Sequence, residues 1–198
     1  MLDYKTSLVI IGGLNSLITS ALFIRTIIKK QTIPHLYSQI IWTITVTISF
    51  LGQVYDNSGV GTWILFLIDC GVITILFLSI KYGIKEPTKW DKIFLTLALV
   101  SMIPRILTKN PLYSVILVTF IDVLGYFPIL NKIKRYPNSE VLYPRIIGNI
   151  SFITGFIGLN HISILSALYI TVSFSMNFIV IFSIIYFKYF RLGTLKIR

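Results

Sequence analysis

Long apolar segments alternate with short polar ones along the whole chain. Seven apolar segments recur, and the polar segments between them are rich in Lys, Pro, Gly and Asn. About 20 mostly apolar residues in a helix are enough to cross the ~30 Å hydrocarbon layer of a bilayer. The pattern therefore predicts seven transmembrane helices, at residues 7–28, 35–53, 62–80, 93–107, 112–130, 145–159 and 162–186.

The composition supports a membrane protein over a soluble one. Hydrophobic residues make up 55% of the 198 residues and charged residues 13%, whereas soluble domains average about 25% charged residues. The net charge of +11 comes from bases that sit between apolar segments, so we expect no nucleic acid as a partner. The partner that the composition indicates is the lipid bilayer. Asp3 and the lack of a small-x-small cleavage site favour a first helix that is kept over a removable signal peptide.

The basic residues divide unequally between the two predicted sides of the membrane. Fifteen of the eighteen fall on one side, and only Lys5, Arg105 and Lys109 fall on the other. Lys and Arg are enriched in cytoplasmic loops. We therefore predict an N-terminus outside and a C-terminus in the cytoplasm, in the plasma (inner) membrane of a prokaryote.

An internal repeat is indicated by matches at an offset of 106 residues. Leu36-Tyr37 falls on Leu142-Tyr143, and further matches are Ile40-Ile41 with Ile146-Ile147, Ile44 with Ile150 and Gly52 with Gly158. Both windows follow a basic loop and open a helix of the same orientation. This predicts an all-α fold of two parallel three-helix bundles in a 3+1+3 order: residues 1–90, a linker helix within 91–110, and residues 111–198.

One motif carries a resemblance to a known family. Tyr126-Phe127-Pro128 is followed by Asn131, Ser139, Glu140, Asn149 and Thr154-Gly155. This stretch resembles the second PQ-loop motif of cystinosin-like carriers, and the topology resembles the SWEET and PQ-loop superfamily, which includes the nicotinamide riboside carriers. The resemblance implies transport of a small polar solute by alternating access, with Pro128 as a hinge. Ile129 stands where the motif has Gln, and Leu22 stands at the matching Pro position of the first repeat.

Two acids lie within apolar segments. An ionisable group at membrane depth costs at least ~2.5–3.5 kcal/mol, so its retention needs a reason. Asp69 and Asp122 each lie about ten residues from the predicted outer end of their helices, and we expect both at a midplane site that binds solute or protons. The alternative is a hydrogen-bonded or Arg-paired packing role. Arg105 could be such a charge partner, could recognise an anionic cargo, or could snorkel to the outer interface.

Uncharged polar residues occur at similar depth. The candidates for the same site are Asn15, Ser16, Asn149, Ser175 and Asn177. At the repeat offset Ser16 corresponds to Asp122 and Ser175 to Asp69, as expected for groups around a shared cavity. Interhelical hydrogen bonding is the alternative. Trp42 fits either an aromatic belt or a stacking role in the cavity.

These features favour a carrier that works as a uniporter or with protons. The alternative is a non-transport seven-helix receptor or scaffold whose basic cytoplasmic face docks a partner. We expect no enzyme activity, no cofactor and no metal site, because the sequence has no nucleophile, phosphate-loop or metal-ligand motif. The sequence also permits a homo-oligomer.

Overall fold

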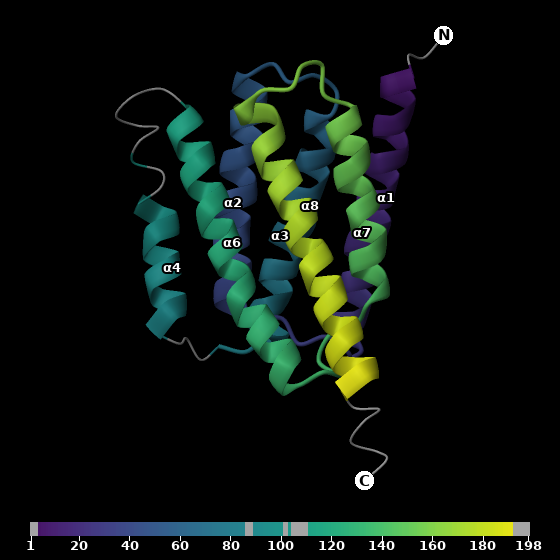
Figure 1. Cartoon of the computed structure of the whole chain (residues 1–198), viewed down its shortest axis with the longest axis vertical. Coiled ribbons are helices and arrows are strands. Elements are labelled where there is room, and N and C mark those ends of the chain that lie inside the picture. The colour runs from purple at the N-terminus through teal and green to yellow at the C-terminus, as the bar shows by residue number, and fades with distance from the viewer. Residues whose placement is uncertain (1–3, 86–88, 101–102, 104–110, 192–198) are drawn as a thin grey trace.

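The computed structural model describes residues 4–85, 89–100, 103 and 111–191 (Figure 1). Regular structure in these ranges is helical, as predicted. The seven α-helices are α1 (Tyr4–Ile28), α2 (Leu36–Tyr55), α3 (Thr62–Tyr82), α4 (Lys89–Val100), α6 (Pro111–Arg135), α7 (Tyr143–Ile157) and α8 (Ile164–Ile185). A π-helix, Tyr186–Arg191, continues directly from α8.

Several helix ends differ from the predicted ones for a physical reason. The fifth predicted helix ends at residue 130, but α6 continues through Pro128 to Arg135 and carries Lys132, Lys134 and Arg135 in its last turn. The prediction places these bases in a loop, but positive side chains at the C-terminus of a helix are favoured by its dipole. The fourth helix begins at Lys89, four residues before the predicted start. Pro104 and Arg105 lie outside the described residues.

Four helical segments are long and apolar enough to cross a membrane. They are Tyr4–Ile28, Thr62–Tyr82, Leu112–Arg135 and Ile164–Phe190. The other helices are more polar or shorter. Helix α2 has 20 residues but buries several hydroxyl and amide side chains, and α7 has only 15 residues, which span about 22 Å at 1.5 Å per residue.

The helices stand side by side in two groups of three (Figure 1). Helix α3 packs against both α1 and α2, and α8 packs against both α6 and α7. The two groups meet where α1 packs on α7 and where α2 packs on α6. Helix α4 lies at the edge, against α2 and α6.

The outside of the bundle is apolar, and its interior mixes apolar clusters with buried polar side chains. Ile10, Ile11, Leu14 and Leu17 on α1 are among many large apolar side chains that are exposed. The buried polar side chains within the helices include Ser16, Thr45, Asp69, Asp122, Asn149, Ser173 and Asn177. A water-soluble bundle has the opposite distribution, because its apolar stripe faces the core.

The two ends of the bundle differ. The lower end of Figure 1 holds the loops 29–35 and 136–142, and the upper end holds the loops 56–61 and 158–163. At the upper end the backbone N–H of Gly61 donates to the carbonyl of Gly158 at 3.1 Å. A Cβ atom on Gly61 would lie 2.6 Å from the carbonyl oxygen of Gly155. Glycine is therefore required for this close approach of α3 and α7.

Candidate functional site

A cavity of about 170 Å³ lies between the two groups of helices. Each of α1, α2, α3, α6, α7 and α8 contributes side chains to its wall. The wall begins near the middle of the bundle, at Ser16, Val46 and Tyr169, and reaches the loops of the lower end at Thr32 and Glu140. Above it, α3 and α7 meet where the backbone N–H of Gly61 donates to the carbonyl of Gly158.

Asp122 of α6 lies in the deep part of the cavity wall and is 1% exposed. Its carboxylate accepts three hydrogen bonds from hydroxyl groups of α2 and α8: Thr45 at 3.0 Å, Tyr169 at 3.2 Å and Ser173 at 3.3 Å. Hydroxyl groups can both donate and accept. They can therefore form hydrogen bonds with this carboxyl group in its ionised form and in its protonated form.

The lower part of the cavity carries a buried charge network. Glu140 accepts from Lys132 of α6 and from Arg145 of α7, the latter at 3.0 Å. Burial opposes the ionisation of Glu140, but the two cations outweigh burial and hold the pKa of its carboxyl group below the ordinary value. Two positive side chains thus share one negative partner at the mouth of the cavity.

A carboxamide pair extends this network towards the middle of the bundle. Arg145 donates from Nη1 to the Oδ1 atom of Asn177 at 3.2 Å. The Nδ2 atom of Asn177 donates to the Oδ1 atom of Asn149 at 2.7 Å and to the carbonyl of Arg145 at 3.1 Å. Asn177 lines the cavity, and Asn149 holds it in place from behind.

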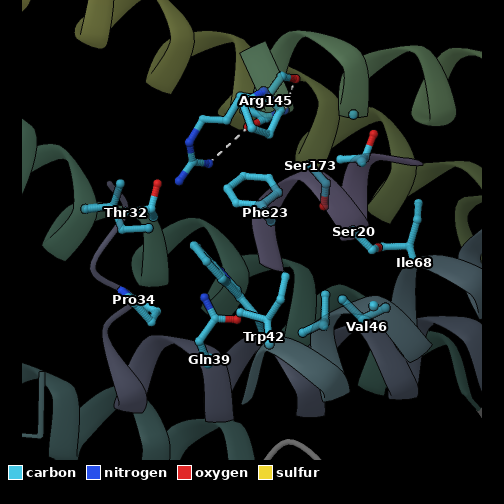
Figure 2. A pocket seen from close by; sticks show the side chains of 18 of the residues that line it. Ser20, Phe23, Thr32, Pro34, Gln39, Trp42, Val46, Ile68, Arg145 and Ser173 are labelled. Atoms are coloured by element: carbon cyan, nitrogen blue, oxygen red, sulfur yellow. Dashed lines mark hydrogen bonds between the residues drawn. The ribbon is translucent and has the colours of Figure 1, made fainter. Parts of the chain in front are cut away.

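Aromatic rings form part of the same wall (Figure 2). The Trp42 ring packs against Tyr126, with centroids 5.3 Å apart. The guanidinium of Arg145 lies 5.5 Å from the ring centroid of Phe23 and points into the cavity (Figure 2). Apolar ring faces and polar groups therefore alternate around the space, an arrangement typical of small-molecule sites.

Four of the predicted site residues line the cavity: Asp122, Trp42, Ser16 and Asn177. The hydroxyl of Ser16 itself donates to the Gly13 carbonyl of its own helix at 2.8 Å. The structure thus brings together candidates from α1, α2, α6 and α8.

The structure places the other predicted site residues elsewhere. Asp69 accepts from Thr47 at 3.0 and 3.1 Å between α2 and α3. Asn15 donates to the Ile147 carbonyl at 2.7 Å and to Ser151 at 2.8 Å between α1 and α7. Ser175 is exposed on α8 and donates to the carbonyl of Thr171. Pro128 is half-buried within α6.

Sequence reasoning did not identify Arg145, Glu140 or Lys132 as site residues. In the sequence, Arg145 and Lys132 indicate only the orientation of the chain, and Glu140 belongs only to the motif. One signal was present: Glu140 and Arg145 flank Pro144 at the start of a helix, and charges of opposite sign so close to an apolar segment can pair inside the bundle.

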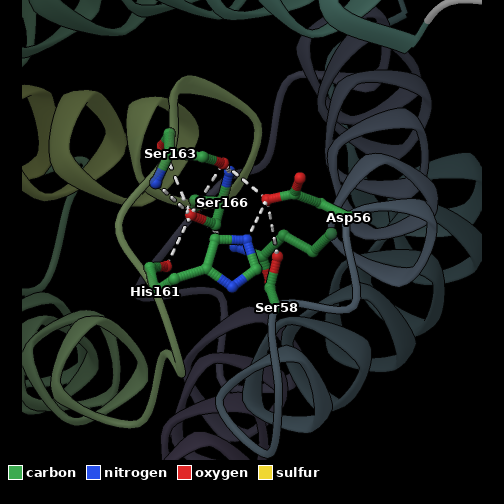
Figure 3. Close-up of polar contacts among 6 residues, drawn as sticks. Asp56, Ser58, His161, Ser163 and Ser166 are labelled. Carbon is green, nitrogen blue, oxygen red and sulfur yellow. Dashed lines mark hydrogen bonds and ion pairs between the residues drawn. The ribbon is translucent and has the colours of Figure 1, made fainter.

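The upper end carries a second polar cluster, centred on Asp56 (Figure 3). Its Oδ2 atom contacts His161 Nε2 at 3.0 Å and accepts from Ser163 and from Ser58, the latter at 3.4 Å. Ser163 is also the N-cap of α8, where it forms a capping box with Ser166. This cluster joins the α2–α3 loop to the α7–α8 loop above the cavity.

No protein-family model, curated protein or solved structure matches this chain. The described residues hold no group of three His, Cys, Asp or Glu side chains that could bind a metal ion. The interpretation of the site therefore rests on its geometry and on the sequence motif.

Proposed function

We propose that this chain is an integral membrane carrier that moves a small polar solute by alternating access. The N-terminus lies outside and the C-terminus in the cytoplasm, so the lower end faces the cytoplasm. The observation that carries the proposal is the cavity between two groups of three helices, which is lined by apolar side chains and by several polar and charged ones. It reaches the loops of one end while the other end is closed. Such a cavity fits the cytoplasm-facing state of a carrier.

The helix contacts support two repeats with a linker at 91–110. In two such repeats, α6, α7 and α8 are the counterparts of α1, α2 and α3. Exchanging the two groups then turns the contact between α1 and α7 into the contact between α6 and α2. Both contacts exist and both are extensive. The contacts of α3 within the first group likewise have counterparts made by α8 within the second. This is the pattern expected for parallel repeats around an axis along the membrane normal.

The cavity wall supports the same repeat at the level of single residues. Eight pairs of lining residues are separated by the 106 residues of the sequence offset. They are Ser16 and Asp122, Ser20 and Tyr126, Phe23 and Ile129, Pro34 and Glu140, Gln39 and Arg145, Trp42 and Gly148, Val46 and Phe152, and Gly71 and Asn177. The paired residues occupy equivalent backbone positions but carry different side chains. The charged members of these pairs all lie in the second repeat.

Asp122 is the residue that we assign to solute or proton binding. It is a carboxyl group in the deep wall, its partners are hydroxyl groups, and no cation in the described part of the chain pairs with it. A buried acid without a charge partner inside a membrane protein indicates a functional role. Opening the upper end would require the Gly61–Gly158 contact and the Asp56 cluster to separate.

Two serines on α8 provide a matched test of the cavity. Ser173 lines it and Ser175 is exposed on the outside of the bundle. In a Cys70→Ser background, which removes the single native thiol, we expect Ser173→Cys to react with a membrane-impermeant thiosulfonate from the cytoplasmic side. We expect Ser175→Cys to be protected by lipid. Equal labelling of the two positions would contradict the proposed cavity.

Solute flux in proteoliposomes tests the function itself. Wild-type protein should accumulate or equilibrate at least one solute from a broad panel of small polar compounds, and Asp122→Asn should lose most of that flux. Ser175→Ala is the control variant and should transport normally. A wild-type protein that moves no solute, and that instead copurifies with a partner through the exposed Lys134 and Arg135, would favour the receptor or scaffold alternative.

A further inference from the structure

We infer that the cavity binds a small organic carboxylate that carries a flat ring. This inference rests on the proposed function, because it names the solute of the same site. It is based on three features of the cavity: hydrogen-bonding atoms without a protein partner, a surplus of positive charge in its lower part, and aromatic faces on two walls.

Four buried polar atoms of the cavity wall have no hydrogen-bond partner in the described part of the chain. They are Thr19 Oγ1, Thr32 Oγ1, Trp42 Nε1 and Arg145 Nε. The nitrogen atoms of Trp42 and Arg145 can only donate. A buried donor without a partner destabilises the protein. A ligand whose acceptor atoms reach Trp42 Nε1 and Arg145 Nε would remove that destabilisation.

The charges of the lower cavity point to an anion. Lys132 and Arg145 share Glu140, which leaves one positive charge in excess within the network. Lys132 directs its ammonium group to Glu140 and to the carbonyl of Ile33. Arg145 donates one N–H of Nη1 to Asn177 and one N–H of Nη2 to Glu140, so its Nε–H is one of three N–H groups without a protein partner. A ligand carboxylate would complete the charge balance through a charge-assisted hydrogen bond.

A cation fits the cavity less well. The two carboxylates of the wall already have partners, since Glu140 holds two cations and Asp122 accepts from three hydroxyl groups. A neutral polyol would leave the excess positive charge of the Lys132–Glu140–Arg145 network unbalanced.

The ring is inferred from the walls. Phe23 on α1 and Trp42 on α2 line the cavity from helices that are separated by α3. The volume of about 170 Å³ offers roughly ten water-sized positions. That space suits a monocyclic or bicyclic ligand with a short carboxylate arm.

Binding of matched acids and amides to the purified full-length protein tests the inference. The probes are benzoate, phenylacetate and indole-3-acetate, each measured by calorimetry beside its neutral amide. We expect at least one acid to bind, and at least tenfold more tightly than its amide. No binding by any of the three acids at millimolar concentration, or equal binding of acid and amide, would overturn the inference.

Two variants locate the effect. Trp42→Phe keeps a ring and removes the Nε1 donor, so acid binding should weaken about three- to tenfold. Trp63→Phe, at an exposed ring on α3, should leave binding unchanged. Arg145→Lys keeps the charge and removes Nε, and it should reduce the preference for acid over amide. If Arg145→Lys does not fold, the comparison of Trp42→Phe with Trp63→Phe tests the inference. Equal affinities of these two variants for the acids would overturn it.

Failure of the inference and failure of the proposed function give different results. Flux of neutral or cationic solutes, with no preference for acids and no effect of Trp42→Phe, would support the carrier and contradict the carboxylate site. Binding of acids that Trp42→Phe weakens, without flux of any solute, supports the carboxylate site and removes the carrier.

Discussion

The upper and lower ends of the bundle are built from the same six helices but are closed and open, respectively. At the upper end α3 and α7 meet through backbone atoms at Gly61 and Gly158, and Asn160 donates from its backbone to the carbonyl of Ser58. At the lower end Phe23, Trp42, Arg145 and other large side chains stand between the helices. Small residues let helices touch, and bulky polar or aromatic ones keep them apart.

The two ends also differ in how their ion pairs are placed. The Glu140 network is buried, with side-chain exposures of 2% for Glu140 and 8% for Arg145, whereas His161 in the Asp56 cluster is 49% exposed. Water screens the upper pair, so separating it costs little. The lower network is buried and is not screened by water, so separating its charges costs more. The polar cluster of the closed end can thus be separated at lower cost than the buried network of the open end.

The largest effect is expected from Glu140→Gln. Removal of one partner from a buried charge network leaves uncompensated charge, which typically costs about 3–5 kcal/mol. The free energy of unfolding, measured by titration with SDS in detergent micelles, should fall by this order. An unchanged value would show that the network is solvated and that the two ends do not differ in this respect.

A smaller loss is expected from Gly61→Ala at the upper end. The new methyl group would lie 2.6 Å from the carbonyl oxygen of Gly155 and 2.9 Å from the carbonyl carbon of Gly158, and overpacking of this kind costs about 1–3 kcal/mol. Gly155→Ala is the matched control, because its nearest neighbour would be 3.7 Å away. The same unfolding measurement should show the control unchanged or slightly more stable. Equal effects of the two substitutions would contradict the close contact.

Acid should weaken the lower network selectively. Because the pKa of Glu140 is lowered in the folded protein, its ionisation stabilises the fold fully above about pH 4.5. This contribution is lost as the pH falls through the lowered pKa. The difference in unfolding free energy between wild type and Glu140→Gln should therefore shrink as the pH drops below 4.5. A difference that stays constant with pH would rule out this role for Glu140.

The smallest effect is expected from Asp56→Asn. An ion pair exposed to this extent is worth about 0.2–1 kcal/mol. Stability should therefore change little, while the rate at which the upper end opens should rise. Labelling of Ser173→Cys from the outer side in proteoliposomes measures that opening, with the Asp56 side chain intact as the control. A loss of stability as large as that of Glu140→Gln would contradict the contrast between the ends.

The sequence was most informative about Asp122 and least informative about Asp69, the other acid within an apolar segment. Both are single acids in apolar segments, and nothing local distinguishes them. The packing of α3 turns Asp69 towards Thr47, whereas the packing of α6 turns Asp122 towards the cavity. Ser173 and Ser175 show the same limit, since residues two apart on a helix lie on nearly opposite faces.

The sequence by itself determined that the chain is helical and where most helices lie, because backbone hydrogen bonds of a helix form within one segment and apolar length is a local property. Only the tertiary structure decided which face of each helix meets the cavity, because that depends on neighbours far along the chain. It also joined Arg145, Glu140 and Lys132 into one network, which in the sequence were ordinary charges near helix ends.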